Sequence, residues 1–517
     1  MNIKDLKYAV LIIFAVAIFL LCSACSENTA PSQSPAPEKS AWSDIMDLSE
    51  RRNVHLVVIG SVPADFDEVL EEINQKLVNK INTTISVKII SLSEWNVIYP
   101  LMLSGGEQID LIYTAEWCDY AQEAMRNAFV ELTEDFVRKY MPLSWEHTPE
   151  TVWDQARISG KVYALPRTFT DNSSYGAVLI RDDILEMTGM KTVDSYDSYE
   201  EFLLRSAKLS LEGYPLDAFP SLPMVSMLML PKEHMLTVCQ ELVWDTDNPM
   251  INADQIEFMY DTEEYKDFCL RMAAWAKAGV WPSNAISGTI HTFRHLEEGR
   301  SFSAVVRMHE AQNYLDSLEK RGYPASCYCI LDDDTYVRKN NYSGDMISIS
   351  IFSADPERAA LCLDVLKNDK EINLLCQGGI EGRHYIMNPD GTRARGPEYA
   401  DYIWSDWAWA LRNEQFYPQE KRSEEVQKTA DQLDAHLLPE EKWPFNGFHT
   451  DDLACEDEIT VIRSLIREYE YSFNLGVFGD ETEEKVAEFR KKLHDAGLDT
   501  VMKEWKAQAD AWLKKGK

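Results

Sequence analysis

The chain has 517 residues, of which 45% are hydrophobic, and its 86 acidic and 51 basic side chains give a formal net charge of −35. This charge argues against nucleic acids and polyanionic ligands, because like charges repel one another. A chain of this length can bury a large core and is too long for one ordinary domain, so we expect two or three domains.

The first 25 residues have the pattern of an export signal. A short region with two lysines is followed by an apolar run over residues 8–21, which is too short to span a bilayer comfortably. The small residues Ser23 and Ala24 precede Cys25, and this order resembles the bacterial lipobox, whose cysteine receives diacylglycerol and becomes the new N-terminus. We therefore expect residues 1–25 to be a lipoprotein signal peptide, with Cys25 as the lipidated residue.

The lipobox pattern departs from its usual form at Cys22, where most such signals have Leu. Cleavage and release without lipidation is therefore the alternative. Cleavage before Cys22 would place the bulky Leu21 where a small residue is needed, which favours Cys25 as the acceptor.

A spacer follows the signal. Residues 26–40 are rich in Ser and Pro and poor in apolar residues, so they cannot bury enough surface to fold. We expect residues 26–50 to form a tether and a lead-in to the folded body. No later segment is apolar for long enough to cross a membrane.

The cysteines give no metal or redox motif. Two of the ten lie in the signal, and no C-x-x-C pair occurs among the other eight, so neither a zinc nor a thioredoxin signature is present. Cys327 and Cys329 lie two residues apart on a predicted strand, which puts both on one face. We expect buried thiols here rather than a disulfide framework.

The folded part begins with alternating strands and helices. Residues 54–59 are apolar, residues 66–77 carry apolar side chains at helical spacing, and residues 85–89 alternate, which predicts a parallel βαβ unit. A second unit has a helix near residues 95–103 and a strand at 110–114. The carboxyl end of that strand, just before Trp117, is where open α/β sheets bind ligands.

A second lobe is predicted from about residue 166. The segment at 160–166 is a turn and strand stopped by Pro, a strand restarts at 177–181, and a helix at 265–278 and a strand at 303–307 follow. Acidic and Asn-rich residues near 332–341 indicate a return crossing. A strand at 348–352 and a helix starting at Asp355-Pro356 come next, and two helices separated by Gly497 end the chain.

The order of four motifs resembles the extracellular solute-binding proteins of bacterial ABC importers, the family that includes maltose-binding protein. The motifs are DLIYTA at 110–115 with nearby Trp117, GKVYALP at 160–166, ADPERA at 354–359 and GIEGRHY at 379–385. The tail at 487–512, with HDAGLD at 494–499, is similar to a C-terminal domain of unknown function in a Gram-positive lipoprotein subgroup of aldouronate-type oligosaccharide binders.

This resemblance implies an α/β protein with the type II periplasmic-binding-protein fold, in which two α/β lobes close over a ligand in a central cleft and a helical extension follows. The expected boundaries are 51–165 for the first part of lobe 1, 166–340 for lobe 2, 341–440 for the return to lobe 1 and the cleft-wall helices, and 441–517 for the C-terminal helical domain. It implies a monomer, lipid-anchored to the outer face of the cell membrane, that carries an oligosaccharide to permease subunits, without cofactor or metal.

The aromatic content is suited to a sugar ligand. Sugars present apolar C–H faces that stack on aromatic rings, and hydroxyls that need paired polar groups. Of the 14 Trp and 23 Tyr residues, Trp117 follows a strand end where maltose-type binders place a stacking Trp, and Asp119 matches their charged sugar-binding residue. The alternative for Trp117 is packing against the following helix.

Three polar residues of lobe 1 and the hinge are further candidates for ligand binding. Ser61 closes the first strand where members of the family bind ligand, and Arg167 and Asn172 flank the hinge segment at 160–166. Helix capping and a hinge salt bridge are the alternatives for these residues.

Four further candidates come from lobe 2 and the late part of the chain. His309 and Glu310 end a second-lobe strand that faces the cleft in related proteins, although His309 could equally be a satisfied polar core group. Trp404 and Trp407 share one face if their segment is a helix. The two alternatives for these residues are a place in the wall of the cleft and packing between the lobes.

Other functions remain as alternatives. An enzyme is not expected, because no G-x-S-x-G elbow, H-E-x-x-H motif or phosphate loop is present, and carboxylate pairs are uninformative in so acidic a chain. The same fold could bind a peptide or another small solute, since fold does not determine ligand. It could also present its ligand to a membrane sensor.

Overall fold

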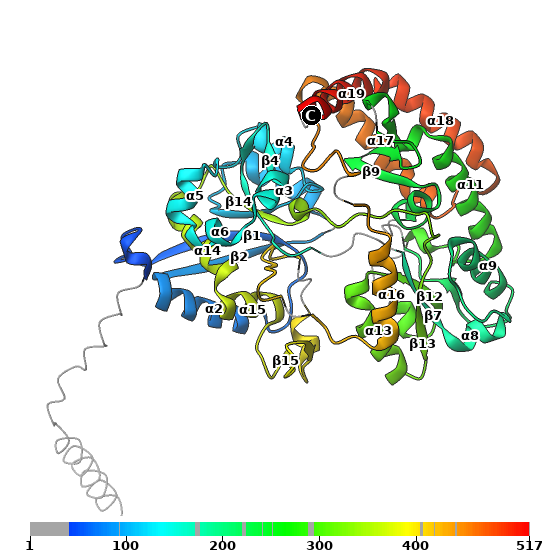
Figure 1. Cartoon of the computed structure of the whole chain (residues 1–517), viewed down its shortest axis with the longest axis horizontal. Helices are drawn as coiled ribbons and strands as arrows, with labels where there is room; N and C mark the ends of the chain where they lie inside the picture. Colours follow the sequence, from blue (N-terminus) through cyan, green and yellow to red (C-terminus); the bar gives the residue numbers. More distant parts are fainter. Residues whose placement is uncertain are drawn as a thin grey trace, which may run out of the picture.

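Two mixed sheets, each covered by helices, form two lobes that lie side by side (Figure 1). The computed structural model describes residues 41–92, 94–170, 176–219, 224–239, 241–250, 252–287, 294–403, 407–417, 419–439 and 442–515. The predicted sites Cys25, Asn172 and Trp404 lie outside the described residues.

Lobe 1 is built on a five-stranded sheet in the order β2-β1-β3-β14-β6. The first strand pairs in parallel with β2 and β3, which confirms the predicted βαβ order, whereas β14 runs antiparallel to β3 and β6. Strand β14 ends before the predicted residue 352, because the chain turns at 351–352. The strands are β1 (Arg52–Ile59), β2 (Thr83–Ile90), β3 (Leu111–Thr114), β6 (Ala164–Pro166) and β14 (Met346–Ile349).

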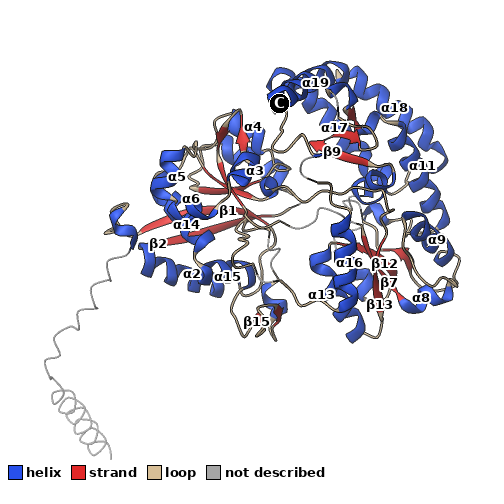
Figure 2. Ribbon diagram, in the orientation of Figure 1, coloured by secondary structure: helices blue, strands red, loops and turns tan. Residues whose placement is uncertain are grey.

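Helices cover both faces of this sheet (Figure 2). The periodicity of α2 explains its position, since the apolar side chains that recur every three or four residues from Phe66 to Ile81 are buried against the sheet. Asp355 caps α14 by accepting a hydrogen bond from the Arg358 amide. The helices of lobe 1 are α2 (Phe66–Ile81), α3 (Trp95–Ser104), α4 (Tyr120–Met125), α5 (Glu134–Tyr140), α6 (Pro142–His147), α7 (Glu150–Gln155), α14 (Pro356–Asn368) and α15 (Lys370–Gly378).

Lobe 2 contains a four-stranded sheet in the order β13-β7-β12-β8. Strand β7 is buried on both faces, and its side chains alternate between two apolar clusters, with Val178 and Ile180 in one and Ala177 and Leu179 in the other. The strands are β7 (Ala177–Arg181), β8 (Tyr214–Leu216), β12 (Ser301–Val306) and β13 (Ala325–Cys329). Helices α8 (Asp182–Met187), α9 (Tyr196–Ser206), α11 (Glu263–Ala278), α12 (Arg294–Glu297) and α13 (Met308–Lys320) also belong to this lobe.

Smaller elements complete the two lobes. The short helix α10 (Leu230–Lys232) precedes a three-stranded sheet of β9 (Met235–Cys239), β10 (Leu242–Asp245) and β11 (Glu257–Phe258) in lobe 2. Two hairpins come after helices of lobe 1 in the chain. The hairpin of β4 (Arg157–Ile158) and β5 (Lys161–Val162) follows α7, and that of β15 (Tyr385–Met387) and β16 (Arg393–Arg395) follows α15.

One helix lies in a different lobe from the one expected. Residues 341–440 were predicted to return to lobe 1, but α16 (Glu424–Ala435) packs on β13 of lobe 2. Its buried face joins the apolar cluster beside β13, and Thr429 donates a hydrogen bond to the Cys327 carbonyl at 3.0 Å. The chain therefore passes back to lobe 2 before α16, since the apolar face of this helix is buried beside β13.

The C-terminal helices extend lobe 2. They are α17 (Glu456–Asn474), α18 (Thr482–Asp495) and α19 (Leu498–Lys515), and they share one apolar cluster with α11. Gly497 lies between the last two with φ +99°, as predicted for a helix-ending glycine.

The cysteine expectation is confirmed for the described residues. All eight described cysteines are free, and Cys327 and Cys329 are both buried. Within the described part of the chain, none of the helices is both long enough and apolar enough to cross a bilayer.

A buried lysine gives the fold a pH dependence that can be measured. Lys367 of α14 is fully buried and donates a hydrogen bond to the Pro166 carbonyl, and burial lowers its pKa to about 7. The pKa of a lysine in an unfolded chain is about 10.4. Between about pH 7 and this value the unfolded state binds more protons than the folded state, so stability rises with pH. Lys367→Met should remove this contribution. The difference between the free energies of unfolding of the variant and the wild type, taken as variant minus wild type, should therefore fall as the pH rises. The expected decrease is up to about 1.4 kcal/mol per pH unit between about pH 7 and 10.

Urea unfolding of both proteins across this range measures the difference. Buried tyrosines and cysteines titrate alike in both proteins and cancel. Parallel stability curves would show that Lys367 keeps an ordinary pKa.

Candidate functional site

Four aromatic side chains gather at the carboxyl end of β3. The Trp117 ring centroid lies 5.5 Å from that of Trp95, 5.8 Å from Tyr113 and 5.9 Å from Trp407. The Trp95 and Trp407 rings meet Trp117 nearly edge to face, at 90° and 77°, an arrangement that aromatic quadrupoles favour. We call these four residues the aromatic cluster.

Trp117 is the exposed member of the aromatic cluster. It remains 41% exposed, whereas Tyr113 is fully buried and the other two are half-buried. Its Nε1 donates a hydrogen bond to the Gly344 carbonyl at 2.9 Å. The indole is thus held in one orientation with apolar surface open to solvent, which is the property that a stacking platform for a sugar ring needs.

A buried ionic group lies behind the aromatic cluster. Asp345 accepts a hydrogen bond from the Tyr113 hydroxyl at 2.9 Å, and its carboxylate contacts the guanidiniums of Arg167 and of Arg412, the latter at 3.2 Å. The three charged side chains are at most 6% exposed. Burial raises the pKa of Tyr113, and the Asp345 charge raises it further, so this hydroxyl stays a donor.

The same group joins the three passages between the lobes, which follow β6, precede β14 and precede α16. The Arg167 amide donates to the Asp345 carbonyl at 3.2 Å, and the Thr168 amide donates to the Arg412 carbonyl at 2.9 Å. Arg167 also donates to the Asn341 carbonyl at 2.8 Å. This is the hinge of the two-lobed fold, and Trp117 is hydrogen-bonded directly to it.

The structure places the predicted lobe 1 and hinge residues in four settings. Ser61 is exposed just after β1, while Trp117 and Trp407 belong to the aromatic cluster. Arg167 forms the hinge salt bridge that was the alternative to ligand contact. Asp119 is directed toward the C-terminal helices, since Arg463 and Arg126 are its main charged neighbours while burial raises its pKa.

The segment of Trp407 is not a helix. Residues 407–409 form a turn, and Ala410 has a positive φ of 52°, which interrupts helical geometry. The expected helical pairing of Trp404 with Trp407 therefore does not explain the position of Trp407. The contacts of Trp407 with Tyr113 and Trp117 explain its position.

The predicted lobe 2 residues lie in the first turn of α13. His309 and Glu310 are half-buried there, directly after β12. Glu310 lies close enough to Tyr314 and Tyr399 to raise the pKa of both hydroxyls, although burial is the larger cause. Because Tyr399 belongs to a lobe 1 segment, Glu310 lies on the side of lobe 2 that is near lobe 1.

Several residues of the site were missed by the sequence reasoning. Tyr113 precedes Trp117 by four positions within a motif that had been noticed, so its place at the strand end could have been found. Trp95 begins a predicted helix, and nothing in the local pattern of Asp345 or Arg412 marks either as a hinge residue. Their roles arise only from the packing of distant segments.

One acidic and histidine cluster resembles a metal site in composition. Asp65, His384 and Glu398 offer ligand atoms within 4.8 Å of one another. However, the Ile380 amide donates to His384 Nδ1, which leaves Nε2 to donate to Asp65, and the Arg383 guanidinium contacts both Asp65 and Glu398. The candidate metal-ligand atoms are already engaged in hydrogen bonds and ion pairs, so the arrangement favours an ion cluster centred on Arg383 over a metal site.

Two surface cavities lie away from the aromatic cluster. One, of about 400 Å³, is lined by residues such as Asp47, Arg52 and Arg358 near the start of the folded body. The other, of about 440 Å³, lies beside α8 and Tyr328. Neither includes a predicted site residue.

Comparison with known proteins identifies related chains. Residues 444–514 match a family described as a domain of unknown function, DUF3502, which confirms the predicted C-terminal domain. A carbohydrate ABC transporter substrate-binding protein of Streptococcus pneumoniae serotype 4 (strain ATCC BAA-334 / TIGR4) is 20% identical over 527 residues, covering 99% of both chains. The predicted resemblance to the solute-binding proteins of ABC importers is thereby confirmed.

Solved structures confirm the fold. The N-glycan transport solute binding protein NgtS from Streptococcus pneumoniae, in complex with Man1GlcNAc, matches with a TM-score of 0.70 and 17% identity, covering 90% of this chain and 100% of that one. The alginate-binding protein AlgQ2 matches with a TM-score of 0.66 and 14% identity, covering 90% and 99%. The α/β fold with two lobes and a helical C-terminal region is that of the periplasmic solute-binding proteins.

Removal of the hinge carboxylate should strongly destabilise the protein. Asp345→Ala leaves the buried guanidiniums of Arg167 and Arg412 without their counter-charge, and we expect a loss of about 3–5 kcal/mol in the free energy of unfolding, measured by urea denaturation. Asp480→Ala is the control, because its ion pair with Lys277 is largely exposed and its loss should leave the stability nearly unchanged. Equal losses in the two variants would contradict the assigned role of Asp345.

Proposed function

We propose that the protein is an extracellular solute-binding protein that captures an oligosaccharide between its lobes and delivers it to an ABC importer. The observation that carries this proposal is the exposed, hinge-bonded ring of Trp117 at the carboxyl end of β3. In an open α/β sheet this edge is where ligands bind. The similar N-glycan transport protein in complex with Man1GlcNAc and the similar alginate-binding protein support the same ligand class.

The site combines a stacking face with polar groups from both lobes. Trp117, supported by Trp95 and Trp407, would take the apolar face of a sugar ring, and Ser61 would supply a hydroxyl from lobe 1. His309 and Glu310 would approach the other side of the ligand from lobe 2. Closure of the lobes around the hinge would then desolvate the sugar hydroxyls and pair them.

The proposed partners follow from the family relationship. The monomer would hold its ligand for a membrane permease powered by a separate ATPase, and Cys25 would carry the lipid that anchors it to the outer face of the membrane. The related proteins are named as binding proteins of transport systems, which supports binding without turnover.

The aromatic platform is tested by calorimetry with the full chain against neutral and acidic oligosaccharides, amino acids and short peptides. Trp117→Ala should weaken binding of the recognised glycan by at least about tenfold, since it removes the stacking surface. Trp145→Ala is the matched control, because Trp145 is 37% exposed and lies under Arg138 instead of in the cluster. Binding of peptides alone, or unchanged glycan affinity in Trp117→Ala, would refute the proposal.

The anchor is tested by metabolic labelling. Cys25→Ser should abolish incorporation of labelled palmitate and release the protein into the medium, because only the cysteine thiol accepts diacylglycerol. Cys22→Ser should stay labelled and cell-bound. Labelling that persists in Cys25→Ser would place the acceptor elsewhere.

A further inference from the structure

The C-terminal domain, residues 444–514, is fused to lobe 2 through one apolar core. Phe473 of α17 lies 6.1 Å from Tyr265 of α11, and Trp505 of α19 lies 6.5 Å from Phe258, between ring centroids. Gly476 approaches so closely that a Cβ would lie 2.3 Å from the Met272 carbonyl oxygen. These contacts leave no room for sliding, so the domain and lobe 2 form one body.

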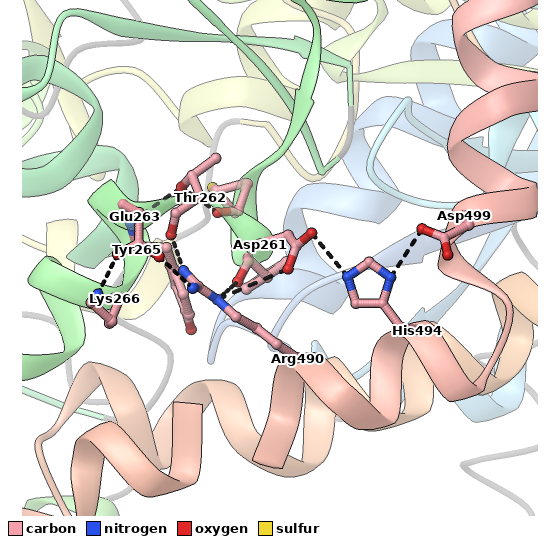
Figure 3. A network of polar contacts seen from close by, with 10 residues as sticks. Asp261, Thr262, Glu263, Tyr265, Lys266, Arg490, His494 and Asp499 are labelled. Carbon is pink, nitrogen blue, oxygen red and sulfur yellow. Dashed lines mark hydrogen bonds and ion pairs between the residues drawn. The ribbon is translucent and has the colours of Figure 1, made fainter. Parts of the chain in front are cut away.

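Polar contacts reinforce this union at the start of α11 (Figure 3). Arg490 donates to the Thr262 carbonyl and pairs with Glu263 at 2.8 Å. His494 lies between Asp261, at 3.1 Å, and Asp499, at 3.0 Å. The domain is thus joined to lobe 2 by charge as well as by apolar packing.

The contact of the C-terminal domain with lobe 1 is mainly polar, although Gly447 also lies against α7, where a Cβ would come within 2.9 Å of the Asp154 carbonyl oxygen. Gln122 of α4 donates to Asp452 at 2.9 Å, Arg126 pairs with Glu456, and Gln155 of α7 donates to Asn446 at 2.8 Å. Among the described residues, the apolar core of lobe 1 contains no residue of 444–514. A polar contact of this size can break and reform without exposing apolar surface.

Two residues connect this contact to the parts that move. The Gln155 side chain also accepts from the Tyr342 amide at 2.6 Å, in the passage before β14, and its carbonyl accepts from His449. Buried Asp452 also pairs with Arg463 of α17 and accepts from Trp505 of α19. A displacement of lobe 1 would therefore change contacts of both the hinge and the C-terminal helices.

From this asymmetry we propose that the C-terminal domain is a brace that sets the resting angle between the lobes. It moves rigidly with lobe 2, and its polar contact with α4 and α7 holds lobe 1 in one orientation until ligand binding provides a better one. The inference rests on the proposed function only in taking lobe movement as part of binding. It gives a role to a domain whose family description assigns none.

The test measures the distance between lobes in the absence of any ligand. Spin labels at Glu71→Cys on α2 and Glu319→Cys on α13, both exposed positions, report the distance distribution in the full chain purified in detergent. Asn446→Ala with Glu456→Ala removes the exposed brace side chains and leaves lobe 1 and the hinge unchanged. We expect the population at the wild-type distance to fall by about threefold or more.

Two further variants complete the design. Glu456→Arg, a single exposed change that sets two like charges against each other at Arg126, should shift the distribution in the same direction. Lys277→Ala is the matched control, because its partner Asp480 belongs to the same rigid body, and it should leave the distance unchanged.

Each outcome decides the proposal. A wild-type distribution in both brace variants, or an equal shift in Lys277→Ala, would overturn it. Because no sugar is used, failure of glycan binding in the calorimetry would refute the proposed function without touching this result, and an unchanged distance with normal glycan binding would refute the brace alone.

Discussion

The carboxylate of Asp345 is the interaction on which the arrangement of the two lobes depends. It pairs with both Arg167 and Arg412, which come from the other two passages of the chain, and it accepts a hydrogen bond from the Tyr113 hydroxyl. Charges this deeply buried are tolerated only when paired and hydrogen-bonded. One acidic side chain therefore joins its own segment to two others, which lie 178 and 67 residues away in the sequence, at a single point.

The candidate binding surface is built outward from that point. Tyr113 packs against Trp117 and Trp407, and the Gly344 carbonyl beside Asp345 orients the Trp117 indole. A platform held in this way keeps little rotamer freedom, so less entropy is lost when a sugar stacks on it. The same link means that a ligand on Trp117 acts on the hinge directly.

The C-terminal helices add a constraint from the opposite side. Their apolar union with lobe 2 and their polar contact with lobe 1 differ in strength because apolar burial is lost only when the core opens, whereas hydrogen bonds exchange readily with water. The hinge determines the axis along which the lobes can turn, and the polar contact determines where they rest.

Local periodicity was enough to predict β1, α2 and β2, because alternation and helical spacing are properties of short stretches whose apolar faces must be buried. The platform role of Trp117 remains a prediction, although its exposure at a strand end accords with it. The hinge role of Arg167, the position of α16 on lobe 2 and the direction of Asp119 were decided by tertiary structure. Asp345, Arg412 and Trp407 acquire their roles from partners up to several hundred residues away, and no local pattern carries that information.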